Sequence, residues 1–323
     1  MALRSPFGPL STAEDVLRGH DLSAKTVVVT GAASGIGIET VRALAVAGAG
    51  VTLAVRNVEA GRSVVRSLEA EHPGARLNVV EVDLASLSSI HHAAEIISER
   101  LGVVDILINN AGVMATPFAR TAEGYELQFG TNHVGHFALT MGLRAALSRS
   151  GAARVVSLSS SGHRLSAMNW SDPNYELRPY DRWAAYGQSK TANALFAVAI
   201  TDRFSADGIV ANAVMPGGIM TGLQKHLSFE DQRAAGFVDE HGAFNARFKN
   251  VAQGAATSVW AAVGTELEGV GGLYLENCGE ASVMDPTKPY EGYMPWALDR
   301  RDADRLWELS LDLTRESAGD ARW

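Results

Sequence analysis

A tyrosine and a lysine stand four residues apart in Tyr186-Gly-Gln-Ser-Lys190. On a helix this spacing puts the phenol and the ammonium on one face, one turn apart. A tyrosine ordinarily has a pKa of about 10, and a fixed positive charge beside it favours the phenolate and lowers that pKa. The pair predicts a general acid/base at Tyr186. Two exposed side chains of an amphipathic helix have the same spacing, so the prediction needs further motifs.

A glycine-rich turn near the N-terminus provides one such motif. The apolar run 27–29 leads into Thr30-Gly-Ala-Ala-Ser-Gly-Ile-Gly37, and a helical pattern follows. In this order of strand, turn and helix, Gly31 permits a tight reversal, Gly35 lets a pyrophosphate approach the backbone, and Gly37 allows close packing. The N–H groups and the dipole of the first helical turn favour a phosphate. We therefore expect a dinucleotide site, although the spacing GxxxGxG differs from the general GxGxxG.

Strand and helix patterns alternate from Lys25 onward. We expect strands at 26–29, 51–55, 77–82, 104–108, 154–158, 210–214 and 272–275, and the main helices at 38–47, 59–71, 87–101, 121–149, 183–204 and 251–263. This alternation predicts the α/β class, with a single doubly wound Rossmann-type domain whose seven-stranded parallel sheet carries helices on both faces.

We expect the chain to divide around that one domain, since no internal repeat and no linker is visible. Residues 1–24 form an N-terminal arm with a short helix that Ser11 or Thr12 caps. Residues 25–284 form the catalytic domain, with a substrate-lid insertion at about 217–250. Residues 285–323 form a C-terminal extension that packs on the same domain.

Composition narrows the class of protein. The 323 residues are 46% hydrophobic and 20% charged, which is typical of a globular chain with a large core. The net charge of -8 without a basic cluster argues against nucleic acid or an anionic membrane as a partner. The apolar stretch 43–55 is too short for a membrane anchor. One cysteine, Cys278, and no signal-peptide pattern predict a cytoplasmic location.

Four motifs in order make the chain resemble the short-chain dehydrogenase/reductase superfamily. They are the glycine turn 30–37, Asn109-Asn-Ala-Gly112, the serine run 159–161 at a strand end, and the segment 186–190. The resemblance covers roughly residues 25–280. Closer details resemble the retinol-dehydrogenase and WW-domain-oxidoreductase branch, namely Val-Asp-Leu at 82–84, Ser-Ser-Ser-Gly-His at 159–163, Ser-Lys-Thr-Ala-Asn at 189–193 and Leu-Trp-Glu-Leu-Ser at 306–310.

The resemblance implies a catalytic set of four residues: Asn132, Ser160, Tyr186 and Lys190. Ser159 and Ser161 stay open as alternatives for the serine. In this family the serine and the tyrosine hydrogen-bond the substrate oxygen, and the tyrosine delivers the proton. The lysine also holds the nicotinamide ribose, and the asparagine positions a water that links the lysine to solvent.

We expect the cofactor contacts at the carboxyl ends of the strands, where a doubly wound sheet binds its ligand. Besides Tyr186 and Lys190 they comprise Gly31, Ser34, Gly35, Ile36, Gly37, Arg56, Asp83, Leu84, Asn110, Ala111, Gly112, Pro216, Gly217, Ile219 and Thr221. The resemblance places Asp83 at the adenine, the stretch 110–112 on the nicotinamide side, and Ile219 and Thr221 at the carboxamide.

The end of the second expected strand favours NADP(H) over NAD(H). An NAD enzyme usually carries an acidic side chain about 20 residues past the glycines, where it holds the ribose hydroxyls. Val55 stands at this point and Arg56 follows, whose guanidinium can form paired hydrogen bonds to a 2′-phosphate. Ser34 counts against NADP(H), since some NADP-preferring relatives carry a basic residue there.

These features together predict an oxidoreductase that transfers a hydride between NADP(H) and a carbonyl or alcohol. The insertion is rich in Leu223, Leu227, Phe229, Phe237, Phe244 and Phe248. They indicate an apolar or bulky substrate under a lid, and equally two helices that pack on the core. The alternatives are a reductase of conjugated carbon–carbon double bonds and a non-catalytic dinucleotide-binding regulatory protein.

Two further expectations concern metals and assembly. His133, His136 and His163 lie in different elements without a ligand pattern, so we expect no metal site. Homodimers and homotetramers are common in the family, and the resemblance leaves both open.

Overall fold

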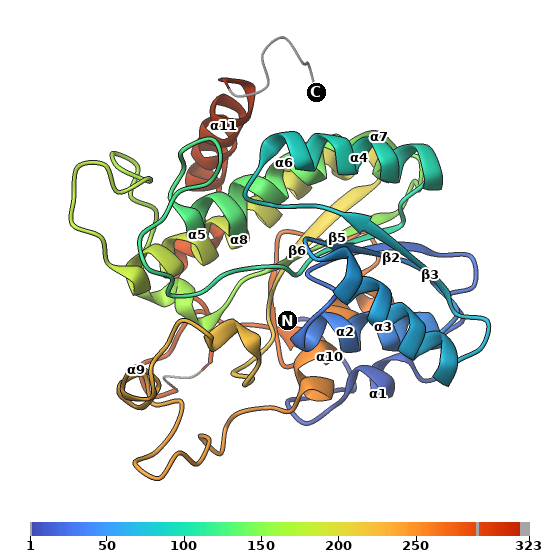
Figure 1. The fold of residues 1–323 in the computed structure, drawn as a ribbon, viewed down its shortest axis with the longest axis horizontal. Coiled ribbons are helices and arrows are strands. Elements are labelled where there is room, and N and C mark those ends of the chain that lie inside the picture. The colour runs from blue at the N-terminus through green and yellow to red at the C-terminus, as the bar shows by residue number, and fades with distance from the viewer. Residues whose placement is uncertain (1, 289–290, 317–323) are drawn as a thin grey trace.

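The computed structural model describes residues 2–288 and 291–316 (Figure 1). Its centre is one eight-stranded sheet in the order β3-β2-β1-β4-β5-β6-β7-β8. The strands are β1 (Thr26–Thr30), β2 (Gly50–Val55), β3 (Arg76–Glu81), β4 (Ile106–Asn109), β5 (Ala153–Leu158), β6 (Ile209–Met215), β7 (Tyr274–Glu276) and β8 (Gly279–Glu280). All neighbouring pairs up to β6 and β7 are parallel. The order reverses between β1 and β4, which marks the switch point of a doubly wound sheet.

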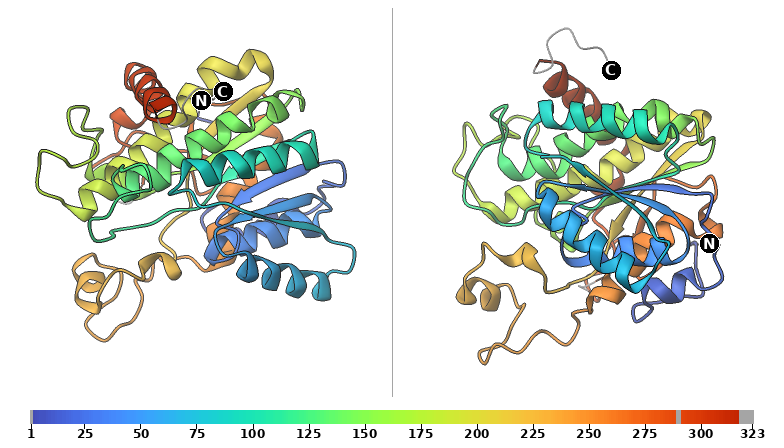
Figure 2. Two further views of the ribbon diagram at one scale, coloured as in Figure 1. Left: turned by 45° about the horizontal axis from the view of Figure 1, so that its top comes forward. Right: turned by 45° about the vertical axis from the view of Figure 1, so that its right-hand side comes forward.

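Helices cover both faces of the sheet (Figures 1 and 2). One face carries α1 (Ala13–Leu17), α2 (Gly35–Val46), α3 (Val58–Glu71) and α10 (Val251–Val263). The other carries α4 (Leu87–Leu101), α5 (Leu127–Phe129), α6 (Gly135–Gly142), α7 (Arg144–Ser148), α8 (Arg182–Phe204) and, outermost, α11 (Arg300–Glu316). These layers confirm the predicted α/β class.

The central strands are apolar on both sides because each face of the sheet packs on helices. In β1, Val27 and Val29 belong to the core cluster of α2 and α10, whereas Val28 between them belongs to the cluster of α4 and α8. All three side chains are fully buried. A continuous apolar run is the expected pattern for such a strand.

The prediction of seven parallel strands was wrong by one strand. β8 is antiparallel to β7, and Asn277 and Cys278 form the two-residue turn between them. Both turn residues have positive φ angles, 50° and 56°, as a tight hairpin turn requires. A strand of two residues is too short to produce a periodic sequence pattern, so pattern analysis does not predict it.

The long helix expected at 121–149 was also wrong in its extent. Helical structure begins at Leu127, because the side chain of Glu126 accepts hydrogen bonds from the N–H groups of Gln128 and Phe129 and caps the helix there. A π-helical turn, Gly130–Val134, separates α5 from α6, and Leu143 separates α6 from α7. The segment before Glu126 is a loop in which Gly124 has a φ of 91°.

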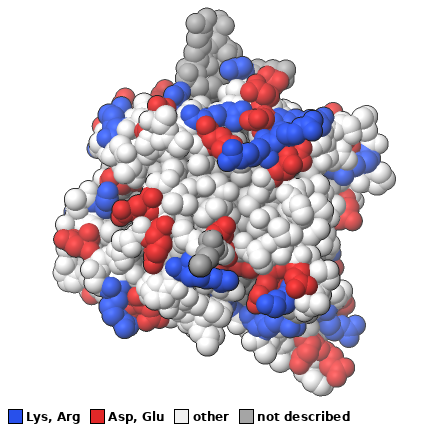
Figure 3. Space-filling view, turned by 180° about the vertical axis from the view of Figure 1, so that it is seen from behind, with Lys and Arg blue, Asp and Glu red and all other residues white. Residues whose placement is uncertain are grey.

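Both ends of the described chain pack against the sheet layers. Thr12 caps α1 through a capping box with Asp15, and α1 lies against α10 and α2. α11 lies along α8, where Trp307 contacts Phe204 and Phe196. Figure 3 shows positive and negative side chains interspersed on the face seen from behind. No helix within the described ranges has both the length and the hydropathy that a bilayer span requires.

The segment after β6 leaves the body of the molecule as a lobe, drawn in gold and orange in Figures 1 and 2. It holds a short 3-10 turn, Gly222–Gln224, and the six-residue helix α9 (Phe229–Ala234), none of whose residues is buried. The chain returns to the body where Lys249 donates its N–H to the carbonyl of Gly218. This lobe borders the cavity described next.

Candidate active site

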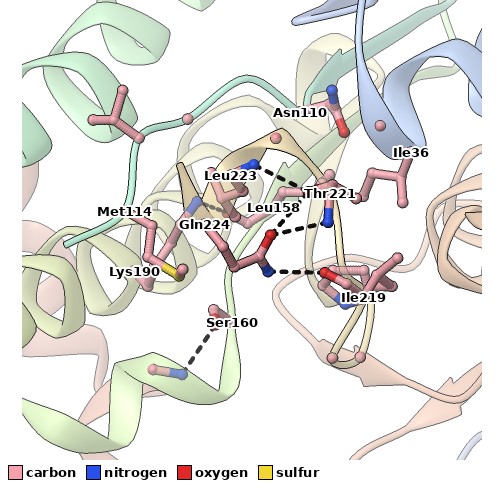
Figure 4. Close-up of a pocket in the computed structure, with 18 of the residues that line it drawn as sticks. Ile36, Asn110, Met114, Leu158, Ser160, Lys190, Ile219, Thr221, Leu223 and Gln224 are labelled. Carbon is pink, nitrogen blue, oxygen red and sulfur yellow. Dashed lines mark hydrogen bonds between the residues drawn. The ribbon is translucent and has the colours of Figure 1, made fainter. Parts of the chain in front are cut away.

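A cavity of about 1440 Å³ lies at the carboxyl ends of β1, β2, β4, β5 and β6 (Figure 4). Most of the expected site residues line it: Gly31, Ser34, Gly35, Ile36, Arg56, Asp83, Leu84, Asn110, Ala111, Gly112, Ser160, Tyr186, Lys190, Pro216, Gly217, Ile219 and Thr221. Gly37 and Asn132 lie behind this lining. The fold thus brings residues from seven distant stretches of the chain to one hollow.

The glycine turn has the shape that a dinucleotide site needs. Gly31 has a φ of 64°, and a Cβ there would come within 2.8 Å of the Cα of Ala111. A Cβ at Gly37 would meet the Gly31 carbonyl oxygen at 2.4 Å. α2 begins at Gly35, and the hydroxyl of its N-cap residue, Ser34, makes no capping hydrogen bond. Backbone N–H groups at the start of a helix and an uncommitted hydroxyl therefore border the cavity, which fits a pyrophosphate.

Asn110 holds the turn in place from the neighbouring strand. Its side-chain amide donates to the carbonyl of Thr30 at 2.8 Å. The Thr30 hydroxyl in turn accepts the backbone N–H groups of Asn110 and Ala111, both at 2.9 Å. The motif Asn109–Gly112 therefore fixes the ends of β1 and β4 to one another while Ala111 and Gly112 face the cavity.

The end of β2 presents Arg56 to the same cavity. The side chain is exposed, and within the described part of the chain its guanidinium has no ion-pair partner. Val55 before it is buried in the core. On the next strand along the edge, Asp83 accepts the N–H of Ala85 at 2.9 Å and also lines the cavity.

The three serines after β5 differ in what they contact. The hydroxyl of Ser159 is buried and donates to the carbonyl of Lys190 at 2.8 Å. The hydroxyl of Ser160 accepts the N–H of Gly162 at 3.0 Å (Figure 4). It also interacts with the phenol of Tyr186. Ser161 is exposed. The geometry thus puts Ser160 beside Tyr186, whereas Ser159 fastens the strand to α8.

Tyr186 and Lys190 lie one turn apart on α8, as the spacing predicts, and both are buried. The Lys190 ammonium donates to the carbonyl of Leu158 at 2.9 Å and lies 5.8 Å from the centre of the Tyr186 ring. Burial raises the pKa of Tyr186 to about 12, although the hydrogen bond from Ser160 lowers it in part. Burial likewise lowers the pKa of Lys190 to about 8.

The direction for Tyr186 is opposite to the one expected from the sequence. A charge about a turn away favours the phenolate, but loss of hydration in the core disfavours it more strongly. In the chain alone the phenol therefore keeps its proton at neutral pH. The ammonium of Lys190 keeps most of its charge at pH 7, since its pKa stays above that value.

Asn132 lies in the π-helical turn Gly130–Val134, where its side chain is fully engaged. Its amide oxygen accepts the N–H of Val113 at 2.8 Å, and its amide nitrogen donates to the carbonyl of Val113 and the hydroxyl of Ser189, both at 2.9 Å. A Cβ at Gly112 would meet the Asn132 oxygen at 3.1 Å and the Lys190 nitrogen at 3.5 Å. Asn132 thus joins the loop after β4 to Ser189, the residue before Lys190.

The three histidines that might have suggested a metal are buried separately. Within the described residues no cluster of three or more histidine, cysteine or acidic side chains could hold an ion. Burial lowers the pKa of His133 to about 3, and that of His136 and His163 to about 4. Each ring is hydrogen-bonded to protein groups, His136 between the carbonyl of Asn132 and the hydroxyl of Thr30. They are neutral core residues.

The apolar end of the cavity draws on two parts of the chain. Leu223, Phe237 and Phe248 of the lobe line it, whereas Leu227, Phe229 and Phe244 do not. Sequence reasoning missed Met114 and Trp183, which also line it and pack with Tyr186 and Phe237. The position of Trp183 was open to prediction, because a residue three places before Tyr186 shares its helix face.

Comparison with known proteins gives a consistent result. The sequence model of the short chain dehydrogenase family matches residues 25–232. The chain is 45% identical to a Streptomyces lividans protein named "Probable oxidoreductase", over 90% of this chain and 98% of the relative. It is 39% identical to the Short-chain dehydrogenase/reductase prx1 of Penicillium rubens, over 94% and 89%. It is 36% identical to the WW domain-containing oxidoreductase of Gallus gallus, over 98% and 74%.

Solved structures agree on the fold. A crystal structure of an uncharacterized protein from Mycobacterium paratuberculosis superposes with a TM-score of 0.71 at 33% identity, covering 94% of this chain and 97% of that one. A gluconate 5-dehydrogenase from Burkholderia cenocepacia, crystallised with NADP and tartrate, superposes with a TM-score of 0.61 over 82% and 96%. At 21% identity the second likeness concerns the fold alone.

Proposed function

Since the chain belongs to the short-chain dehydrogenase/reductase family of NAD(P)-dependent oxidoreductases, we propose that it transfers a hydride between NADP(H) and an apolar carbonyl or alcohol, with Tyr186 as general acid/base. One observation carries this proposal. Tyr186, Lys190 and Ser160 border one cavity whose far end is the glycine turn. A cofactor on the turn and a substrate at the tyrosine would share that space.

The bound dinucleotide would supply or take up the hydride. The glycine turn, the start of α2 and Thr221 would hold it, since a side chain at Gly35 would meet Thr221 at 3.2 Å. Arg56 would pair with a 2′-phosphate, and its lack of an ion-pair partner in the described chain supports NADP(H) over NAD(H).

Ser160 and Tyr186 act on the oxygen of the substrate. Their hydroxyls already lie within hydrogen-bonding contact of one another, so both can donate to one oxygen atom placed between them. In carbonyl reduction negative charge develops on that oxygen, and Tyr186 gives it a proton. The raised pKa of the phenol in the cofactor-free chain means that the proton is present at neutral pH.

Lys190 and Asn132 support the tyrosine. The ammonium is held by the carbonyl of Leu158 and keeps a positive charge near the phenol, which favours the phenolate after proton transfer. Asn132 hydrogen-bonds Val113 and Ser189, the residue before Lys190. A water-mediated proton path from Lys190 past Asn132 stays a prediction that the family resemblance supports.

The apolar wall supports an apolar substrate. Met114, Trp183, Leu223 and Phe237 face the cavity next to Tyr186, and they offer no charge to a polar group of the substrate. Burial of such surface favours a ligand with a hydrocarbon body. The proposal includes that the lobe closes over the substrate as a lid.

A panel of ketones, aldehydes and alcohols, followed at the nicotinamide absorbance with NADPH and NADH in parallel, tests the proposal. We expect turnover on apolar carbonyls with a preference for NADPH, and an alcohol as the product. A saturated carbonyl product from conjugated substrates would instead identify a double-bond reductase. Cofactor binding without turnover on the whole panel would contradict a catalytic role.

Location and assembly are secondary proposals. The single, buried thiol of Cys278 supports a cytoplasmic location, where thiols stay reduced. A homodimer and a homotetramer both stay open, and light scattering on the purified chain separates them.

A further inference from the structure

His163 lies in the 3-10 turn Ser161–Leu165 next to Ser160, and the mechanism above gives it no part. The ring is fully buried, and both of its nitrogens are engaged. Nδ1 lies 2.6 Å from the carbonyl oxygen of Ser160. Nε2 lies 3.1 Å from the backbone nitrogen of Met294, which belongs to the C-terminal part of the chain. The imidazole thus stands between the serine loop and a segment 131 residues away.

The hydroxyl of Tyr274 also lies 3.0 Å from Nδ1, and the partners of the two nitrogens fix the tautomer. A carbonyl oxygen only accepts, so Nδ1 must carry the hydrogen and donate it to Ser160. A backbone N–H only donates, so Nε2 must accept from Met294. Both requirements are met by the same neutral ring, and burial, which lowers the pKa of His163 to about 4, keeps the ring neutral. In a protonated ring Nε2 would also carry a hydrogen, and that N–H would face the backbone N–H of Met294.

The carbonyl of Ser160 collects three donors. Besides the ring of His163 it accepts the backbone N–H of the same residue at 3.0 Å and the phenol of Tyr274 at 3.0 Å. The Ser160 hydroxyl accepts the N–H of Gly162 at the same time. A Cβ at Gly162 would lie 2.6 Å from the Tyr186 ring, so this turn packs directly on the phenol. The backbone that orients the Ser160 hydroxyl is therefore held by His163 and Tyr274.

The segment 292–296 is bound to the same turn by further contacts. Arg164 donates to the carbonyl of Gly292 at 2.7 Å, and the indole of Trp296 donates to the carbonyl of His163 at 3.3 Å. The N–H of Gly292 donates to the buried carboxyl of Glu276 on β7 at 2.7 Å. The beginning of the C-terminal extension is thereby fastened both to the sheet and to the serine loop.

We propose that His163 is a positioning residue, which fixes the backbone of Ser160 and couples it to segment 292–296 of the C-terminal extension. This inference deepens the proposed function and rests on it, because Ser160 matters for turnover only if the chain is the oxidoreductase described above. His163 itself does not line the cavity. It affects turnover by fixing the position of the Ser160 hydroxyl.

Two amide substitutions each keep one of the two hydrogen bonds of His163 and remove the other. In His163→Asn the amide nitrogen can take the place of Nδ1 and still donate to Ser160. In His163→Gln the amide oxygen can take the place of Nε2 and still accept from Met294. A shift of about 1 Å at a catalytic group costs about 100-fold in rate. We therefore expect His163→Gln to lower kcat about 10- to 100-fold, and His163→Asn to keep kcat within about threefold.

The dissociation constant of NADPH should stay unchanged in both variants, because neither bond touches the glycine turn. Thr201→Val is the matched control. It removes a hydroxyl that donates to the carbonyl of Ala211 and accepts the N–H of the same residue, both at 3.0 Å. This contact joins α8 to β6 away from the cavity. The substitution should lower the melting temperature without lowering kcat. Equal kcat in the Asn and Gln variants, or loss of kcat only in step with loss of NADPH binding, would overturn the proposal.

Nitrogen NMR of the histidine rings gives a readout that needs no turnover. His163 is assigned by the signal that disappears in His163→Gln. We expect an Nδ1–H tautomer that stays neutral from pH 7 to pH 5. An Nε2–H tautomer or a charged ring in this range would overturn the proposed positioning role of His163. If the native protein shows that tautomer but turns over no substrate, the proposed function fails and the positioning role fails with it, while the hydrogen-bond assignment stands.

Discussion

Helix α8 and the lobe at 216–250 border the same cavity, but the protein holds them in opposite ways. Every residue of α8 from 185 to 200 is buried, and the helix packs on β5, β6 and α11. In the lobe, α9 has no buried residue, and Phe229 and Phe244 are 47% and 62% exposed. The candidate acid/base pair Tyr186 and Lys190 thus stands on the rigid side, whereas the lobe is lightly packed.

Helix α8 and the lobe should respond differently to substitutions. A buried side chain contributes through partners that cannot rearrange, so its replacement has a large effect. An exposed segment with few packed contacts opens and closes at low cost. We therefore expect large effects from the α8 side and small, substrate-dependent effects from the lobe.

The largest effect should come from Tyr186→Phe. The substitution removes the hydroxyl that gives and takes the proton, and general acid/base groups contribute about 10²- to 10⁴-fold in rate. We expect kcat to fall by this factor while the dissociation constant of NADPH stays the same. Tyr180→Phe, which removes a hydroxyl bonded to Thr116 and Glu126 outside the cavity, is the control. Near-native turnover of Tyr186→Phe would reject the mechanism.

Acid should destabilise the protein through the buried histidines of the rigid side. His133, His136 and His163 have pKa values of about 3, 4 and 4, below the unfolded value of 6.5. Between these values the unfolded chain binds more protons, so stability falls as the pH drops below 6.5, by about 2 kcal/mol for each group at pH 5. The raised pKa values of Glu126 and Glu276 act in the opposite direction.

Urea unfolding at pH 7 and pH 5 measures this effect. We expect a clearly lower midpoint at pH 5 in the native protein. The double variant His226→Gln, His241→Gln, which changes two exposed rings of the lobe, should show the same drop. Equal midpoints at both pH values would mean that the buried rings are protonated in the folded state.

Arg56→Ala should have an intermediate effect, at the edge between the two regions. Loss of hydrogen bonds to a charged phosphate costs about 1 to 3 kcal/mol, or roughly 5- to 150-fold in affinity. We expect NADPH to bind more weakly by this factor and NADH to bind unchanged. Arg62→Ala, an arginine of α3 that pairs with Glu59 and does not line the cavity, is the matched control. Equal losses for the two cofactors would show that Arg56 does not contact the 2′-phosphate.

The smallest effect should come from the lobe itself. Phe248 lines the cavity and packs against Phe237, whereas Phe244 is exposed and does not line it. A half-buried ring gives up only part of the roughly 1.5–3 kcal/mol of a fully buried one. We therefore expect Phe248→Ala to lower kcat/KM about threefold to tenfold for bulky substrates, and Phe244→Ala to leave it unchanged. Identical kinetics in both variants across the panel would favour a lobe that only packs.

Local spacing in the sequence was enough to predict the frame of the site. The glycines of 30–37 and the Asn109–Gly112 motif each follow a short apolar run, which marks them as turns at strand ends. Tyr186 and Lys190 share a face because α8 is helical, whatever it packs against. The same holds for the alternation of strands and helices that predicted the fold class. Such features depend on periods of two and 3.6 residues, which are written in the chain itself.

Only the tertiary structure decided which groups are free and how they titrate. The choice between Ser159 and Ser160 depends on the packing of β5 against α8, which commits the first hydroxyl to the carbonyl of Lys190. The pKa of Tyr186 rises because burial disfavours the phenolate, whereas spacing alone predicted a lowered pKa. His163 meets Met294 across 131 residues of sequence. Desolvation and contacts between distant segments arise only when the chain has folded, and no local pattern encodes them.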